Sequence, residues 1–198
     1  MNRRLLQTRS LSQMVLLFVF SLFLSACGGS LYKVKPVVSA PLPDDAKNVS
    51  TNLISVRAVP LLKDEESQEL FGANMPLAGI LPVRVEIENN SGAVVDLKKA
   101  RFSLSDSSGQ VWKNLSVKST VKRVMKADGF WVYTPASKQE FTDKLSEHTL
   151  NVDVPLNQSE KRAGILFFQK HDKGSVENPQ GLVLKVEKLA EKIELQLN

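Results

Sequence analysis

Apolar and polar residues alternate along short segments of this chain, and that alternation limits its fold more than any other feature. Residues 54–58 and 83–87 show it most clearly. Neighbouring side chains of a strand point to opposite faces, so such segments place one face on a core and the other in water. This pattern is typical of antiparallel sheets. We expect strands at residues 54–58, 83–87, 102–104, 111–112, 130–133, 150–154, 164–168, 182–186 and 193–197, and residues 31–38 leave open a short edge strand.

Three segments instead follow the period of a helix. Residues 64–70 begin with acids, which suit the positive end of a helix dipole. In residues 116–126, Val121 and Val124 lie on one apolar stripe, and the third helix begins with Thr134 as N-cap and Pro135. Eight or nine short strands with these helices between them predict a mainly β fold, an antiparallel β-sandwich with two or three short inserted helices.

The N-terminal segment has the pattern of a secretory signal. Residues 1–13 carry three arginines and no acid, and residues 14–24 are apolar apart from Ser21. A run this short does not cross a hydrocarbon core, which needs about 20 residues. It is typical of the apolar region of a signal peptide behind a basic start.

The motif Leu24-Ser25-Ala26-Cys27 that follows resembles the signal of bacterial lipoproteins. The resemblance implies cleavage before Cys27, a diacylglyceryl group on its sulfur and a further acyl chain on the freed amine. The alternative is an ordinary buried thiol at the end of an uncleaved helix. Gly28 stands where an Asp would resemble an inner-membrane retention signal, so we expect anchoring in the outer membrane, facing the periplasm.

The chain therefore divides into three parts: a signal peptide at residues 1–26, a lipidated N-terminus and flexible tether at residues 27–48, and a β-sandwich domain at residues 49–198. The tether is rich in glycine and proline. As a free coil of 21 residues, 28–48, it would have an end-to-end distance of about 25 Å.

Two segments of the expected domain carry a second resemblance. Residues 79–91, which end in an Asn-rich turn, and residues 164–168 resemble strands of immunoglobulin-like domains in bacterial envelope proteins. The resemblance implies an immunoglobulin-like sandwich and no particular activity.

Composition removes several function classes. Cys27 is the only cysteine of the chain, so there is no disulfide, Cys-x-x-Cys pair or thiolate zinc site in the expected domain. Without the arginines of the signal, 23 basic residues stand against 21 acidic ones, which is not the charge balance of a nucleic-acid-binding protein. Phosphate-binding glycine loops are also missing from the sequence, and we expect no cofactor.

Candidate catalytic residues are few. His148 and His171 stand beside Glu147 and Asp172, a conceivable metal site, but adjacent strand residues face opposite ways. We interpret both histidines as ordinary surface residues and expect neither a metal site nor a Ser/His/Asp triad.

Two further groups could belong to an enzyme or a glycan-binding protein. Glu86 and Glu88 share one strand face at a spacing superficially like that of a glycosidase, although alternating surface acids are the commoner case. Trp112 and the cluster of residues 130–133 could form a sugar or peptide platform, although we expect most of these aromatic side chains in the core.

The feature that points most clearly to binding is a cluster of basic residues. Residues 97–126 contain eight bases and one acid. On a helix at residues 116–126, lysines recur at four-residue steps opposite the valine stripe. The cluster is a candidate site for an anionic surface, with a solvated helix face as the alternative. Its members are Lys113, Lys118, Lys122, Arg123 and Lys126.

These observations favour a membrane-anchored envelope lipoprotein that acts as a non-enzymatic interaction or assembly module. Its expected partners are the membrane, through the lipid anchor, and an envelope protein or an anionic envelope surface. The alternative is an envelope hydrolase or a glycan-binding accessory protein.

Overall fold

The computed structural model describes residues 31–37, 41–129, 134–189 and 191–198, and Tyr32–Asn198 forms one compact unit. The strands are β1 (Lys47–Ser50), β2 (Ile54–Pro60), β3 (Ile80–Asn89), β4 (Arg101–Ser105), β5 (Val111–Asn114), β6 (Lys161–Gln169), β7 (Val183–Glu187) and β8 (Ile193–Gln196). The helices are α2 (Asp64–Phe71), α3 (Val117–Ala127) and α4 (Pro135–His148), with a 3-10 turn, η1, at Leu97–Lys99.

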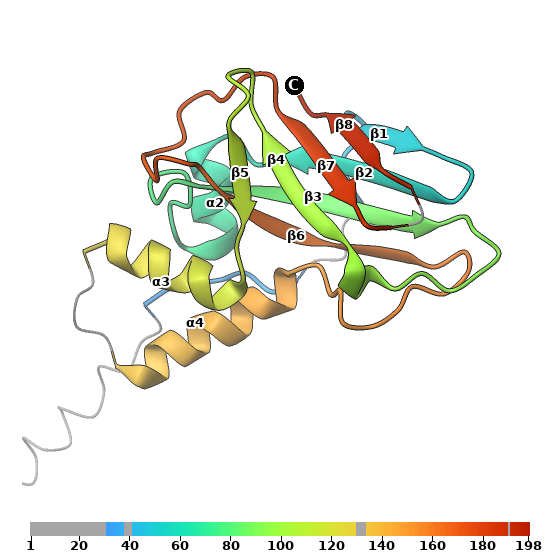
Figure 1. Cartoon of the computed structure of the whole chain (residues 1–198). Coiled ribbons are helices and arrows are strands. Elements are labelled where there is room, and N and C mark those ends of the chain that lie inside the picture. Colours follow the sequence, from blue (N-terminus) through green and yellow to red (C-terminus); the bar gives the residue numbers. More distant parts are fainter. Residues whose placement is uncertain (1–30, 38–40, 130–133, 190) are drawn as a thin grey trace, which may run out of the picture. The chain divides into compact units, whose positions relative to one another are not determined.

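In the described part of the chain, eight strands form a single sheet in the order β1-β2-β3-β6-β5-β4-β7-β8. Every neighbouring pair is antiparallel. The two strands at the ends of this order, β1 and β8, lie side by side, so the sheet nearly closes into a barrel (Figure 1). The expectation of a mainly β, antiparallel fold with inserted helices is confirmed.

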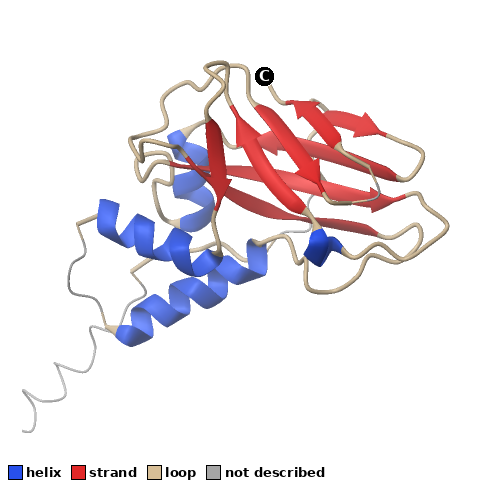
Figure 2. Cartoon of the chain, in the orientation of Figure 1, coloured by secondary structure: helices blue, strands red, loops and turns tan. Residues whose placement is uncertain are grey.

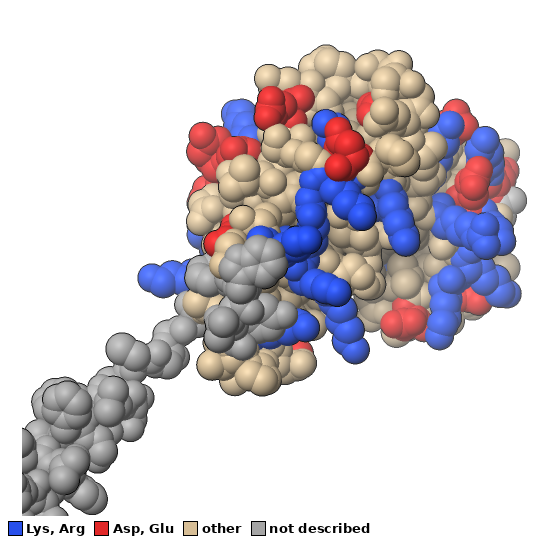
Figure 3. Space-filling view, turned by 60° about the vertical axis from the view of Figure 1, so that its left-hand side comes forward, with Lys and Arg blue, Asp and Glu red and all other residues tan. Residues whose placement is uncertain are grey.

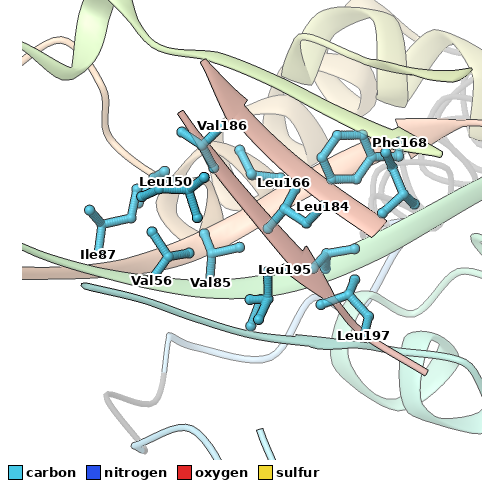
Figure 4. Packing of buried hydrophobic residues seen from close by; sticks show 14 of the residues in the cluster. Val56, Val85, Ile87, Leu150, Leu166, Phe168, Leu184, Val186, Leu195 and Leu197 are labelled. Atoms are coloured by element: carbon cyan, nitrogen blue, oxygen red, sulfur yellow. The ribbon is translucent and has the colours of Figure 1, made fainter. Parts of the chain in front are cut away.

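The main core lies inside this curved sheet. Alternate residues of β2, β3 and β6 point inward, where they meet side chains from β7 and β8 on the opposite wall (Figure 4). Trp112 of β5 is also buried there, and its indole N–H donates to the Asp106 carboxylate at 2.8 Å. The expectation that Trp112 fills the core is therefore confirmed.

A second core lies between the sheet and the helices, which gather on one side of the molecule (Figure 2). Phe71 of α2, Val121 of α3 and Phe141 of α4 pack here against Ile165 and Phe167 of β6. Strand β6 is thus buried on both faces along its second half, which explains why its apolar residues are consecutive rather than alternating.

The helices agree with the sequence predictions because their termini carry recognisable signals. The side chain of Ser116 accepts a hydrogen bond at the start of α3, and that of Thr134 does so at the start of α4, with Pro135 as the first helical residue. The buried face of α3 is also the predicted one, with Val121 and Val124 both buried. The strands expected at residues 182–186 and 193–197 are confirmed as β7 and β8, which pair as an antiparallel hairpin.

In the described residues one strand prediction is wrong, and one strand that the sequence leaves open does not form. Residues 150–154 form a loop, because the chain there crosses β6 where Gly164 has no side chain: a Cβ on Gly164 would lie 2.4 Å from the Leu150 backbone. Only Thr149 makes an isolated bridge, to Ile165. Residues 31–37 do not form the edge strand that was left open; the edge position beside β2 belongs to β1. The predicted strand at residues 130–133 lies outside the described residues.

The tether predicted at residues 27–48 includes side chains that are part of the compact unit. Tyr32 and Leu42 are both buried, although they precede residue 49. The division of the chain at residue 48 stays a prediction, but the packed unit begins at Tyr32.

Candidate functional site

Cys27, the predicted site of lipid attachment, lies outside the described residues, and the packed unit begins five residues after it. The Tyr32 ring stacks on Phe141 of α4, with ring centroids 4.0 Å apart and planes inclined by 18°. Its hydroxyl donates to Asp128, the residue that caps the C-terminus of α3, at 2.8 Å. Burial, this hydrogen bond and the charge of Asp128 hold the pKa of Tyr32 well above its ordinary value. Tyr32 therefore joins the N-terminal segment to both helices.

The backbone that follows Tyr32 lies against the C-terminal end of α2. The Lys35 N–H donates to the Leu70 carbonyl at 2.9 Å, and the Lys35 carbonyl is 2.8 Å from His148 Nε2. Gly72 ends α2 at φ +65°, and a Cβ there would lie 2.5 Å from the Lys33 nitrogen. The glycine is thus needed twice, for the left-handed cap and for the close approach of the segment.

Helix α3 presents a row of lysines on its outer side. Val121, Val124 and Met125 are buried in the second core, whereas Lys118, Lys122 and Lys126 are exposed. We refer to these three lysines as the lysine face. In the part of the chain that the structure describes, none of the three forms an ion pair.

The other two predicted members of the basic cluster differ from these lysines. Lys113 is exposed on β5, next to the start of α3. Arg123 is partly buried, and its guanidinium donates to the carbonyl of Ala78 at 2.9 Å and to that of Lys173. Arg123 thereby holds α3 against two loops, which assigns it a structural contact. With the helices turned forward, Figure 3 shows Lys and Arg side chains gathered across the middle of the surface.

A cavity of about 450 Å³ lies on the outer side of β3 and β6. Its walls come from the N-terminal segment, α2 and the end of α4 as well as from these two strands. Apolar side chains such as Leu42, Leu70 and Ile165 form much of the lining, and Glu66, Arg84, Glu86, Glu147 and His148 supply its charged and polar groups.

The histidines are placed differently from each other. His148 is buried, with an edge-on contact to Phe71, so the interpretation of His148 as a surface residue is wrong; its position at the C-terminal end of α4 turns it into the second core. His171 is exposed in a turn. No cluster of three or more metal-ligating side chains occurs among the residues that the structure describes.

The two strand carboxylates have basic neighbours on adjacent strands. Glu86 pairs with Arg57 of β2 at 3.5 Å, and Glu88 pairs with Lys161 of β6 at 3.2 Å. Such cross-strand pairs at a surface contribute little to stability, about 0–1 kcal/mol. They are the arrangement expected of alternating surface acids.

Sequence reasoning missed two buried residues that connect separate segments of the chain, Tyr32 and Asn89. Tyr32 lay in a segment interpreted as a tether, and the only sign of burial was the apolar character that it shares with Leu31 and Val34, which left open an edge strand. Asn89 was assigned to a turn, but it is fully buried: its amide donates to the carbonyls of Ala93, Leu156 and Asn157. An asparagine directly after an alternating strand gives no sequence signal for such a role.

Residues 130–133, which include most of the predicted aromatic platform, lie outside the described residues. No helix within the described ranges has both the length and the apolar character needed to cross a membrane. Comparison with protein-family models, curated proteins and solved structures finds no match for this chain.

Proposed function

We propose that this chain is a lipid-anchored envelope lipoprotein whose folded unit acts as a non-enzymatic interaction or assembly module, held at the outer membrane and facing the periplasm. One observation carries the proposal. The only cysteine ends a signal-like segment, and the first buried side chain among the described residues, that of Tyr32, follows it by five positions. A processed chain would therefore begin its folded unit almost directly after the anchor.

The number of acyl chains determines how firmly the lipid would hold the protein to the membrane. Each buried CH₂ contributes about 0.8 kcal/mol, so one acyl chain holds a protein reversibly and two or more hold it stably. Three chains on Cys27 would make attachment effectively permanent. A domain kept at a surface gains a high effective concentration for any partner at that surface, which is the use of an interaction module.

The partners of three surface carboxylates favour structural rather than catalytic roles for them. Glu86 and Glu88 are in ion pairs, and Asp106 accepts hydrogen bonds from Ser108 and Trp112 within its turn. Burial raises the pKa of Asp106, but these hydrogen bonds and those from backbone amides outweigh it and hold that pKa below its usual value. An ionised, fully engaged carboxylate of this kind serves structure.

The proposed module has the immunoglobulin-like sandwich arrangement. Strands β1, β2, β3 and β6 would form one layer, and β5, β4, β7 and β8 the other. Side chains from both groups meet in the main core, which supports this division of the sheet.

Membrane fractionation tests the anchor. We expect the wild-type protein in the outer-membrane fraction, labelled by a palmitate precursor and released only by detergent. The substitution Cys27→Ser removes the acceptor sulfur and should move the protein out of that fraction, whereas Ser30→Ala, a small change just after the motif, should leave it there. A Cys27→Ser protein that still fractionates with the outer membrane, or an unlabelled wild type, would remove the proposal.

The cavity supports a second candidate function, a glycan-binding accessory protein or hydrolase. Three glutamates and a buried histidine line a space large enough for a small ligand. Titration with soluble cell-wall glycan fragments tests it. Saturable binding that Glu147→Gln weakens at least tenfold would favour this candidate, and Lys47→Gln on β1 is the control. Absence of binding at millimolar glycan would remove it.

A further inference from the structure

The lysine face of α3 is the strongest feature that the proposed anchor does not itself explain. We propose that Lys118, Lys122 and Lys126 bind the phosphate groups of the same membrane leaflet that holds the acyl chains, so that the domain rests on the bilayer through α3. The inference depends on the proposed anchor at Cys27 and adds to it the partner and the orientation of the module.

The first argument is the length of chain between the lipid and the folded unit. Five residue steps separate Cys27 from Tyr32, and at 3.3–3.6 Å per residue they span at most about 18 Å. The distance of about 25 Å expected for a free coil over residues 28–48 does not apply, because Tyr32 and Leu42 are already packed. A lipid attached at Cys27 therefore keeps the unit close to the headgroups.

The second argument is the point at which the N-terminal segment meets the folded unit. Tyr32 is bonded to Asp128, which caps the C-terminus of α3, and stacks on Phe141 of α4. Helix α3 has 11 residues and is about 17 Å long. The whole lysine face thus lies within about one helix length of the residue from which the lipid is tethered.

The third argument is charge. Lysines at four-residue steps repel one another, and within the described residues none of the three has an acidic partner in an ion pair. The first turn of α3 also contains no acid. By contrast, Lys144 of α4 pairs with Glu140 at 2.7 Å. A layer of phosphates would supply the counter-charge that α3 lacks.

We favour membrane phosphate over a soluble glycan or an acidic protein as the ligand of the lysine face. The lipid anchor is sufficient to hold α3 near the phosphates of the bilayer, whereas it does not bring a soluble ligand to this helix. Each lysine near an anionic surface strengthens binding by about fivefold. The three lysines together should therefore raise the affinity for an anionic membrane by about 100-fold. This effect should fall as the salt concentration rises, since surface charges are screened beyond about 8 Å at physiological ionic strength.

The test uses the full mature lipoprotein, with acylation verified by mass, in vesicles that carry a headgroup-linked quencher. A fluorophore is attached through Ser119→Cys, an exposed position of α3 between the lysines. We expect strong quenching in vesicles containing phosphatidylglycerol, weak quenching in neutral vesicles, and loss of the difference at about 0.5 M salt. Equal quenching in both kinds of vesicle, or none in either, would overturn the inference.

Charge-matched variants separate the lysine face from net charge. Replacing Lys118, Lys122 and Lys126 with Gln should abolish the phosphatidylglycerol-dependent quenching. Replacing Lys47, Lys98 and Lys188, which are exposed outside α3, with Gln should leave the phosphatidylglycerol-dependent quenching unchanged. Thermal unfolding of each variant verifies that it is folded. Equal behaviour of the two triple variants contradicts the inference.

A second measurement distinguishes failure of the inference from failure of the anchor. The mature chain, residues 27–198 with Cys27→Ser and therefore without the signal or the lipid, is sedimented with phosphatidylglycerol vesicles at low salt, and we expect about 100-fold weaker binding when the three α3 lysines are Gln. A soluble sulfated glycan or inorganic phosphate serves as competitor. If the glycan, at equal charge, binds the lysine face as tightly as the vesicles do, the lysine face is assigned to glycans and the membrane docking is overturned. If the native protein is not acylated, it is the anchor that is contradicted instead.

Discussion

Asn89 holds two loops of the molecule with one buried amide. Its Nδ2 atom donates to three carbonyl oxygens, and its Oδ1 atom accepts from the backbone and the hydroxyl of Ser91. Every buried side-chain nitrogen and oxygen of the described residues has a hydrogen-bond partner, so removal of this amide would leave an otherwise satisfied interior with unpaired groups.

We therefore predict that Asn89→Ala lowers the free energy of unfolding by about 2–3 kcal/mol, because buried polar groups would lose their partners. Urea denaturation measures this. The neighbouring Asn90 is exposed, so Asn90→Ala should change stability by less than about 0.5 kcal/mol. Similar losses for both variants would contradict the role assigned to Asn89.

Tyr32 makes a pH-dependent contribution to stability. Its pKa in the folded state lies above the ordinary value of 10.0, chiefly because it is buried and also because it donates to the Asp128 carboxylate. The neutral phenol is therefore favoured by folding, and its stabilising effect is complete below pH 10 and is lost as the pH rises above that value.

We predict that the stability difference between the wild type and Tyr32→Phe is constant from pH 7 to 9. Above pH 10 it should shrink by about 1.4 kcal/mol per pH unit. Urea denaturation at several pH values measures the difference, and the Phe variant acts as the control for the titration of all other groups. A difference that persists unchanged to pH 11 would mean that the hydroxyl is not held as described.

Single residues were also where sequence reasoning was least informative. The burial of Trp112 followed from its aromatic character, but the burial of His148 and Tyr32 did not follow from their neighbours in the sequence. Both depend on contacts between segments far apart in the chain, His148 with the Lys35 carbonyl and Tyr32 with Asp128. Local patterns carry no information about such partners.

At the scale of elements, helix α3 combines two kinds of basic residue. Arg123 donates to the carbonyls of Ala78 and Lys173 and so joins α3 to two adjacent loops at one end of the strand pair, the loop before β3 and the loop after β6. Lys122, beside it in the sequence, is exposed. Only the arginine contributes to the fold.

We predict that Arg123→Gln destabilises the protein by about 1–2 kcal/mol, since it loses hydrogen bonds from a charged donor. Lys122→Gln should stay within about 0.5 kcal/mol of the wild type. Thermal unfolding of the two variants compares them directly. A larger loss for Lys122→Gln than for Arg123→Gln would reverse the roles that the structure gives them.

The elements that sequence reasoning found are those with strong local signals. Caps at Ser116 and Thr134 fix the starts of α3 and α4, and regular alternation identifies β2 and β3. The segment 150–154 alternates too, yet it crosses β6 at Gly164 instead of pairing along a neighbour. Alternation predicts that one side of a segment is buried, but pairing depends on which backbone lies next to it.

At the scale of the whole molecule, the antiparallel sheet could be predicted but its curvature and order could not. Strand β6 lies between β3 and β5, so strands distant in the sequence are neighbours in the sheet. This order places α2, α3 and α4 together against one side of β3 and β6. The lysine face, the N-terminal segment and the cavity all result from that placement, which the sequence alone does not contain.

The central proposal is that Cys27 anchors this unit to a membrane, and the mass of the N-terminal peptide tests it most directly. The protein is extracted in detergent from the membranes of its native cells, digested and analysed by mass spectrometry. We predict an N-terminal peptide that begins at Cys27 and carries a diacylglyceryl group and an amide-linked acyl chain. Mild alkali should remove the two ester-linked chains of the diacylglyceryl group and leave the amide-linked chain. A peptide that retains residues 1–26, or an unmodified thiol at Cys27, would contradict the proposal.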